Sequence, residues 1–150
     1  MSQKIALVLS GGGARGLAHI GVIEELEKRG YSIVSIAGTS MGALIGGVYA
    51  RGKLEEYKNW MYTLDRRKVF SLVDFTFSSS GLVKGDRVLK AMQEFIPDCN
   101  IEDLKIDFSA TATDIANHRE VVYTSGSLYK AIRASIAIPT VLTPVITDGT

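Results

Sequence analysis

The sequence lacks several features that would place it in other protein classes. Its single cysteine, Cys99, excludes an internal disulfide framework and is typical of a reducing compartment. Its 17 Lys and Arg against 16 Asp and Glu leave a net charge of +1, without the basic excess of nucleic-acid-binding proteins. No apolar leader with a cleavage site precedes the first apolar run, which begins at Ile5. We therefore expect a cytoplasmic protein with no nucleic-acid partner.

Residues 31–50 carry no charged side chain, and this length would suit a membrane-spanning helix. However, the glycine-rich stretch 38–42 interrupts the run, and Gly46 and Gly47 weaken its second half as a helix. We therefore interpret the segment as a buried strand, a turn and a buried helix.

Along the chain, short apolar runs alternate with segments of helical periodicity, and no linker or internal repeat divides the 150 residues. The pattern predicts strands at 5–10, 32–37, 108–115 and 120–124, and helices at 17–26, 41–50, 54–64, 86–95 and 128–134. Residues 116–119 would join the last two strands as a hairpin. We expect one domain over residues 1–150, of α/β class, with three α/β/α layers around a mostly parallel central sheet.

Eleven of the 15 glycines lie between Gly11 and Gly52, and six of these eleven belong to two glycine-rich turns. The first turn, from Gly11 through Gly13 to Gly16, satisfies the G-x-G-x-x-G pattern of dinucleotide-binding folds. That pattern needs an acidic residue about twenty positions later for the ribose hydroxyls. Here no Asp or Glu occurs between Glu27 and Glu55. The sequence therefore opposes a nucleotide-dependent oxidoreductase, and we expect no cofactor.

The second turn, Gly38-Thr-Ser-Met-Gly42, satisfies G-x-S-x-G between a predicted strand and a predicted helix. This pattern is typical of a nucleophile elbow, a sharp turn that exposes one hydroxyl above the sheet. Gly38 and Gly42 permit the turn and keep side chains away from Ser40. The amide of Met41 would stand at a helix N-terminus, which favours developing negative charge.

The two glycine-rich turns are expected to act together. Adjacent parallel strands end at the same sheet edge, so Gly11, Gly12 and Gly13 would lie beside Ser40. Their backbone amides would then form an oxyanion hole, in which one donor typically lowers the barrier by about 3 kcal/mol.

The stretches Gly-Gly-Gly-Ala-Arg-Gly at 11–16 and Gly-Thr-Ser-Met-Gly at 38–42 resemble the patatin-like phospholipase family, especially its short bacterial members. Later segments agree: Gly-Leu-Val-Lys-Gly at 81–85, Ala-Thr-Asp at 112–114 and Arg-Ala-Ser-Ile-Ala-Ile-Pro at 133–139. The resemblance covers essentially the whole chain. It implies a lipid acyl hydrolase with a Ser–Asp dyad and no histidine, acting on a phospholipid or acyl ester.

By that resemblance, Ser40 is the nucleophile and Gly11, Gly12 and Gly13 supply the oxyanion amides. Arg15, with Gly16, positions the glycine loop. Cys99 lacks metal-ligand partners at a suitable spacing, so we expect no metal, and the sequence leaves the oligomeric state open.

The family's aspartate, found in a D-G-G or D-G-A motif, has two interpretations here. Asp148-Gly149-Thr150 could be that motif, with Thr150 departing from it. Alternatively, Asp148 and Gly149 form a type I′ hairpin tip, for which Asp-Gly is a preferred pair. The catalytic base would then lie beyond Thr150, and we expect a chain truncated before the D-G-G strand. The corresponding alternative function is a non-catalytic module that binds a lipid or partner.

Three other groups of residues have competing interpretations. His19 is expected to pack or to make a local hydrogen bond, and His118 to be solvated. A Ser40–Asp114–His118 triad would have the hydrolase chain order. Because Asp114 and His118 flank one turn, we favour a local structural role for Asp114.

Arg133 could contact a lipid phosphate or form a structural ion pair. The aromatic stretches 60–62 and 69–77 belong to the core, line an acyl-chain pocket or make transient contact with a membrane surface.

Overall fold

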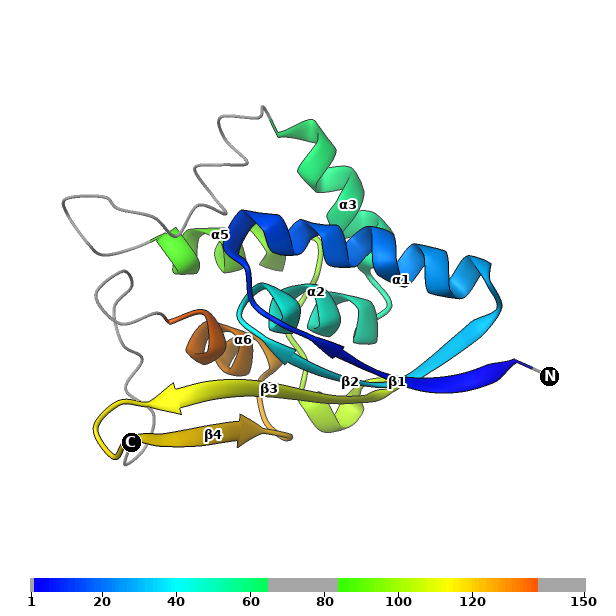
Figure 1. Ribbon diagram of the computed structural model, residues 1–150. Helices are drawn as coiled ribbons and strands as arrows, with labels where there is room; N and C mark the ends of the chain where they lie inside the picture. The colour runs from blue at the N-terminus through cyan, green and yellow to red at the C-terminus, as the bar shows by residue number, and fades with distance from the viewer. Residues whose placement is uncertain (1, 65–83, 138–150) are drawn as a thin grey trace.

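The computed structural model describes residues 2–64 and 84–137 and shows a four-stranded sheet covered by helices (Figure 1). The strands are β1 (Gln3–Leu9), β2 (Tyr31–Thr39), β3 (Asp107–Asp114) and β4 (Arg119–Tyr123), in the spatial order β1-β2-β3-β4. The first three strands pair in parallel, and β4 pairs antiparallel with β3 as the second strand of a hairpin. The sheet is therefore mostly parallel.

The helices fill the connections between strands. They are the 3-10 helix η1 (Gly13–Leu17), α1 (Ala18–Lys28), α2 (Met41–Ala50), α3 (Leu54–Thr63), α5 (Lys84–Gln93), the 3-10 helix η2 (Ile101–Asp103) and α6 (Leu128–Ile136). The α-helices lie over one face of the sheet, and the short η2 lies on its other side (Figure 1). The predicted α/β class is confirmed, because helical segments lie on both sides of a mostly parallel sheet, consistent with the predicted α/β/α layers.

Helix α2 lies at the centre of the core because nearly all of its residues are apolar or glycine. It packs on Ile36 of β2 and Phe108 of β3, both buried. A Cβ added at Gly46 would come within 2.7 Å of the Ile36 Cγ2, so glycine there permits the close approach of helix and sheet. The opposite sheet face is open to solvent in the described residues, with Val8 at 81% exposed.

The observed elements follow the predicted ranges closely. Residues 31–50 form strand β2, a turn and helix α2, as predicted, and α2 covers the predicted range 41–50. Two details differ. The chain forms the 3-10 helix η1 before α1 begins, and the register of β1 against β2 shifts between Ile5 and Ala6.

Candidate active site

Ser40 lies at the junction between the end of β2 and the start of α2. Its backbone has φ 55° and ψ −118°, outside the regions that side-chain-bearing residues ordinarily occupy. The residue retains 9% of its surface exposed. A sharp strand-to-helix turn with a strained serine is the backbone geometry expected of a nucleophile elbow.

The glycines on either side of Ser40 are required by close contacts. A Cβ added at Gly38 would lie 2.6 Å from the Ala43 backbone, and one added at Gly42 would lie 2.1 Å from the Leu9 carbonyl oxygen. No side chain fits at either position without moving backbone. The G-x-S-x-G spacing therefore allows α2 to begin directly against the ends of β1 and β2.

The first glycine-rich turn lies beside Ser40, as predicted from the parallel pairing of β1 and β2. A Cβ added at Gly11 would be 3.4 Å from the Ser40 Cβ and 3.9 Å from its Oγ. Gly12 has φ 144° and Gly13 has φ 54°, values that favour glycine. The Arg15 N–H donates to the Gly12 carbonyl oxygen at 3.2 Å and closes the turn. The Arg15 side chain itself is exposed.

Gly16 joins the glycine loop to the start of α2. A Cβ added there would lie 2.4 Å from the Met41 Cγ, so this position holds the loop directly against Met41. Met41 is the first residue of α2, and its side chain is buried. Its backbone amide therefore belongs to the positive end of the helix dipole, beside Ser40.

Ser135 of α6 also contacts the elbow, and the sequence analysis gave it no role. The Ser40 N–H donates to the Ser135 Oγ at 2.8 Å, and that hydroxyl donates to the Thr111 carbonyl oxygen of β3 at 2.6 Å. Ser135 is 9% exposed. It lies within the 133–139 segment that resembles the family, which was the one signal available in the sequence.

The two histidines occupy the places expected of structural residues. His19 Nε2 donates to the Ser10 carbonyl oxygen at 2.8 Å and ties the start of α1 to the end of β1. The predicted local hydrogen bond is therefore confirmed. His118 lies in the β3–β4 turn, exposed and with φ 52°.

Asp114 holds the β3–β4 turn instead of forming a triad with His118. Its Oδ2 accepts from the Asn117 Nδ2 at 2.7 Å and the Arg119 Nε at 3.0 Å, and its Oδ1 accepts from the Asn117 N–H. These bonds, with that from Asn117 the strongest influence, hold the pKa of Asp114 below its ordinary value of 3.8. The local structural role favoured from the sequence accounts for every one of these contacts.

Asp148 lies outside the described residues, together with residues 81–83 of the 81–85 motif and the aromatic stretch 69–77. Both interpretations of Asp148 therefore stay predictions.

Within residues 2–64 and 84–137, no three His, Cys, Asp or Glu side chains are grouped to hold a metal ion. Burial raises the pKa of the half-buried Cys99 thiol.

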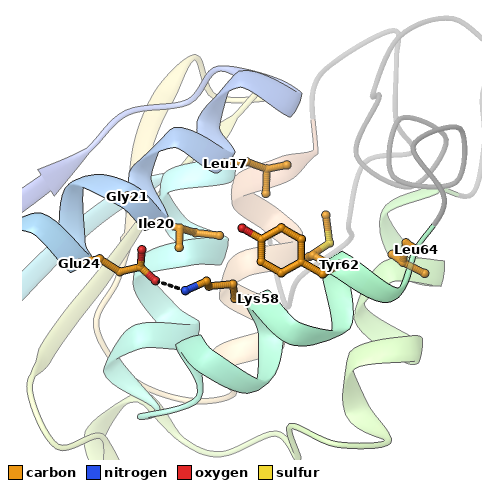
Figure 2. Close-up of a pocket in the computed structure, with 8 residues that line it drawn as sticks. Leu17, Ile20, Gly21, Glu24, Lys58, Tyr62 and Leu64 are labelled. Carbon is orange, nitrogen blue, oxygen red and sulfur yellow. Dashed lines mark hydrogen bonds and ion pairs between the residues drawn. The ribbon is translucent and has the colours of Figure 1, made fainter.

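A groove of about 590 Å³ lies between α1 and α3, close to the glycine loop (Figure 2). The ion pair between Glu24 and Lys58, 2.5 Å apart, crosses one end of it. Its lining residues are mainly apolar: Leu17, Ile20, Gly21, Glu24, Lys58, Met61, Tyr62 and Leu64. The groove adjoins the loop because Leu17 directly follows Gly16.

The side chains of the 60–62 stretch have different surroundings, and its role as an acyl-chain pocket stays a prediction. Trp60 packs between the rings of Tyr57 and Phe95, with centroid distances of 5.9 and 5.4 Å. Met61 and Tyr62 instead line the groove, and Tyr62 is 78% exposed. No helix in the described part of the chain is long and apolar enough to cross a bilayer.

Comparison with known proteins identifies similar sequences. A family model for patatin-like phospholipases matches residues 7–150. An uncharacterized NTE family protein of Mycobacterium tuberculosis (strain ATCC 25618 / H37Rv) is 46% identical over 148 residues, which cover 99% of this chain and 41% of the relative. A protein named lysophospholipase NTE1 from Mycosarcoma maydis is 36% identical over 155 residues, covering 98% of this chain and 8% of the relative.

A second fungal protein, named lysophospholipase nte1, comes from Emericella nidulans and is 34% identical over 155 residues. The match covers 98% of this chain and 10% of that relative. The chain thus spans 41% of the length of the mycobacterial relative and a much smaller share of the fungal ones.

Proposed function

The chain belongs to the patatin-like phospholipase family, and on this premise we propose that it is a serine lipid acyl hydrolase with Ser40 as nucleophile. The observation that carries the proposal is the conformation of Ser40. A non-glycine residue with φ 55° stands at the β2–α2 turn, beside the glycine loop. Backbone strain of this kind persists where the surrounding structure imposes it, and such residues cluster at active sites.

In the proposed reaction, the Ser40 Oγ attacks the acyl carbonyl carbon of an ester and forms a tetrahedral intermediate with a negatively charged oxygen. The backbone amides of Gly11, Gly12, Gly13 and Met41 are the proposed donors to that oxygen. Collapse of the intermediate releases the alcohol part of the lipid and leaves an acyl-enzyme, which water hydrolyses. The contact between Gly16 and Met41 supports this assignment because it holds the two sets of amides together.

An aspartate is the proposed acceptor of the Ser40 proton. We propose either Asp148 or, if Asp148 and Gly149 form a hairpin tip, an aspartate beyond Thr150. The ordinary aspartate pKa of about 3.9 is a poor match for a serine hydroxyl. Stabilisation of the oxyanion would therefore supply most of the acceleration, and the glycine loop becomes as important as the nucleophile.

The proposed substrate is a phospholipid or a lysophospholipid. Two similar proteins are named lysophospholipases, and the family description names phospholipases. The site contacts the substrate at its ester, and transient contact with a membrane surface would supply lipid to it. We propose that the protein acts in the cytoplasm.

A fluorophosphonate probe tests the proposal directly, because it reacts with activated serine nucleophiles. In the complete protein, we expect the probe on Ser40, located by peptide mass spectrometry, and none on the Ser40→Ala variant. The same variant should lower kcat/KM for a lysophospholipid by about 10⁴-fold or more. A wild-type protein that neither reacts with the probe nor hydrolyses the ester would favour the alternative, a non-catalytic lipid-binding module.

A further inference from the structure

The hydroxyl of Ser135 connects three elements that meet at the elbow. It accepts a hydrogen bond from the Ser40 N–H at 2.8 Å and donates one to the Thr111 carbonyl oxygen at 2.6 Å. Ser135 lies on α6, Thr111 on β3, and Ser40 between β2 and α2. Ser135 and Ser40 are each 9% exposed; the bond between them is buried, and the bond to Thr111 is partly buried.

The position of this hydroxyl follows from how the parallel ladder ends. Thr39 is the last residue of β2 in register with β3, and its partner is Thr111. At the next residue the backbone turns to φ 55° and leaves the direction of the strand. The Ser135 hydroxyl bridges the Ser40 N–H and the Thr111 carbonyl oxygen just past that last pair.

Without the Ser135 hydroxyl, the Ser40 N–H would be a buried donor that has lost its partner. Buried backbone N–H groups are almost always paired, and an unpaired one destabilises the conformation that buries it. The strained dihedral angles of Ser40 persist only while its neighbours impose them. Loss of this bond therefore acts on the residue that carries the nucleophilic oxygen.

We propose that Ser135 is a positioning residue that holds the Ser40 backbone, and hence its Oγ, in the geometry required for attack. The proposal rests on the proposed function. Ser135 does not itself act on the substrate, because its single hydroxyl proton is donated to Thr111 and its oxygen accepts from Ser40. Its effect reaches the reaction through the Ser40 main chain.

The test compares Ser135→Ala and Ser135→Thr with a matched control, Ser127→Ala, in the complete protein. Ser127 lies at the N-terminus of the same helix, where its hydroxyl accepts from the Lys130 N–H and donates to Asp98. Each alanine variant thus removes one serine hydroxyl that makes two hydrogen bonds, at the N-cap of α6 for Ser127 and within α6 for Ser135. Only the Ser135 variant removes a bond to the elbow.

In Ser135→Ala we expect kcat to fall by about 10- to 100-fold, since small displacements of a reacting group cost this much. The KM should change by less than about twofold, because the binding groups stay in place. Ser135→Thr, which keeps the hydroxyl, should recover most of the rate. Ser127→Ala should lose stability but keep the wild-type kcat.

Hydrogen exchange of the Ser40 amide supplies a readout that needs no activity. We expect faster exchange in Ser135→Ala than in the wild type, and unchanged exchange in Ser127→Ala at matched stability. Equal kcat in the two alanine variants, or an unchanged Ser40 exchange rate in Ser135→Ala, would overturn the proposal. An inactive wild-type protein whose Ser40 amide still depends on Ser135 would overturn the proposed hydrolase function and leave the Ser135–Ser40 link supported.

Discussion

Two residues in the described part of the chain have a side chain and a positive φ angle: Ser40 at 55° and His118 at 52°. The backbone strain is similar, but the surroundings differ. His118 is exposed in the β3–β4 turn, whereas Ser40 is buried between β2 and α2. The turn is held by Asp114, Asn117 and Arg119, which are all within five residues of one another.

Ser40, in contrast, is held by groups that are distant in the sequence. The Ser135 hydroxyl bonds to it from 95 residues away, and Gly11 packs against it from the end of β1. The turn at His118 follows from local chemistry that any hairpin can use. The strain at Ser40 is imposed by tertiary structure, and this difference separates the β2–α2 turn from an ordinary hairpin turn.

The largest expected effect comes from a comparison of glycine substitutions at the two strained residues. His118→Gly should stabilise the protein by roughly 1 kcal/mol, because glycine adopts positive φ without steric cost, and should leave ester hydrolysis unchanged. Ser40→Gly relieves similar strain but removes the proposed nucleophile, so kcat/KM should fall by about 10⁴-fold or more. Urea unfolding and ester kinetics on both variants measure the two effects. A large loss of activity in His118→Gly would contradict the interpretation of the β3–β4 turn as an ordinary turn with no part in ester hydrolysis.

The next largest effect concerns the steric room at the elbow. Gly42→Ala places a methyl group against the Leu9 and Ser10 carbonyl oxygens, and we expect a loss of about 3 kcal/mol or more in the free energy of unfolding. The matched control is Gly21→Ala in α1, where an added Cβ meets no atom within 4 Å.

Gly21→Ala should stabilise the protein by up to about 1 kcal/mol, because alanine is the better helix former. Unfolding midpoints in urea distinguish the two outcomes. If both variants shifted the midpoint in the same direction, the close contacts at Gly42 would not explain the effect of its substitution on stability.

The smallest effect should come from the pH dependence of the β3–β4 turn. Hydrogen bonds from Asn117 and Arg119 hold the pKa of Asp114 below its ordinary value of 3.8. The stabilisation is therefore fully present above about pH 4 and is lost as the pH falls through the lowered folded-state pKa. Asp114→Asn should be less stable than the wild type at pH 6, and the difference should shrink toward pH 2. Urea unfolding across this range measures it, and a difference that stayed constant with pH would contradict the assignment.

Much of the fold could be predicted from the sequence because its signals are local. Apolar runs bounded by glycines placed β2 and α2, and the G-x-S-x-G spacing placed Ser40 between them. The 3-10 helix η1 was missed because it follows from the packing of Gly16 on Met41, a contact between distant segments. Ser135 was missed for the same reason. Helical periodicity within α3 could have separated Trp60 from Tyr62, since these residues point to different sides of one helix.

The hydrogen bond between Ser40 and Ser135 has a consequence for the order of events during synthesis. Contacts between residues far apart in the sequence close long loops and tend to form late, after local helices and hairpins. A chain still emerging from the ribosome can complete β2 and α2, but it has no partner for the Ser40 amide until α6 has been made and has docked. The nascent polypeptide therefore completes the hydrogen bonding of the Ser40 backbone only after most of these 150 residues have been translated.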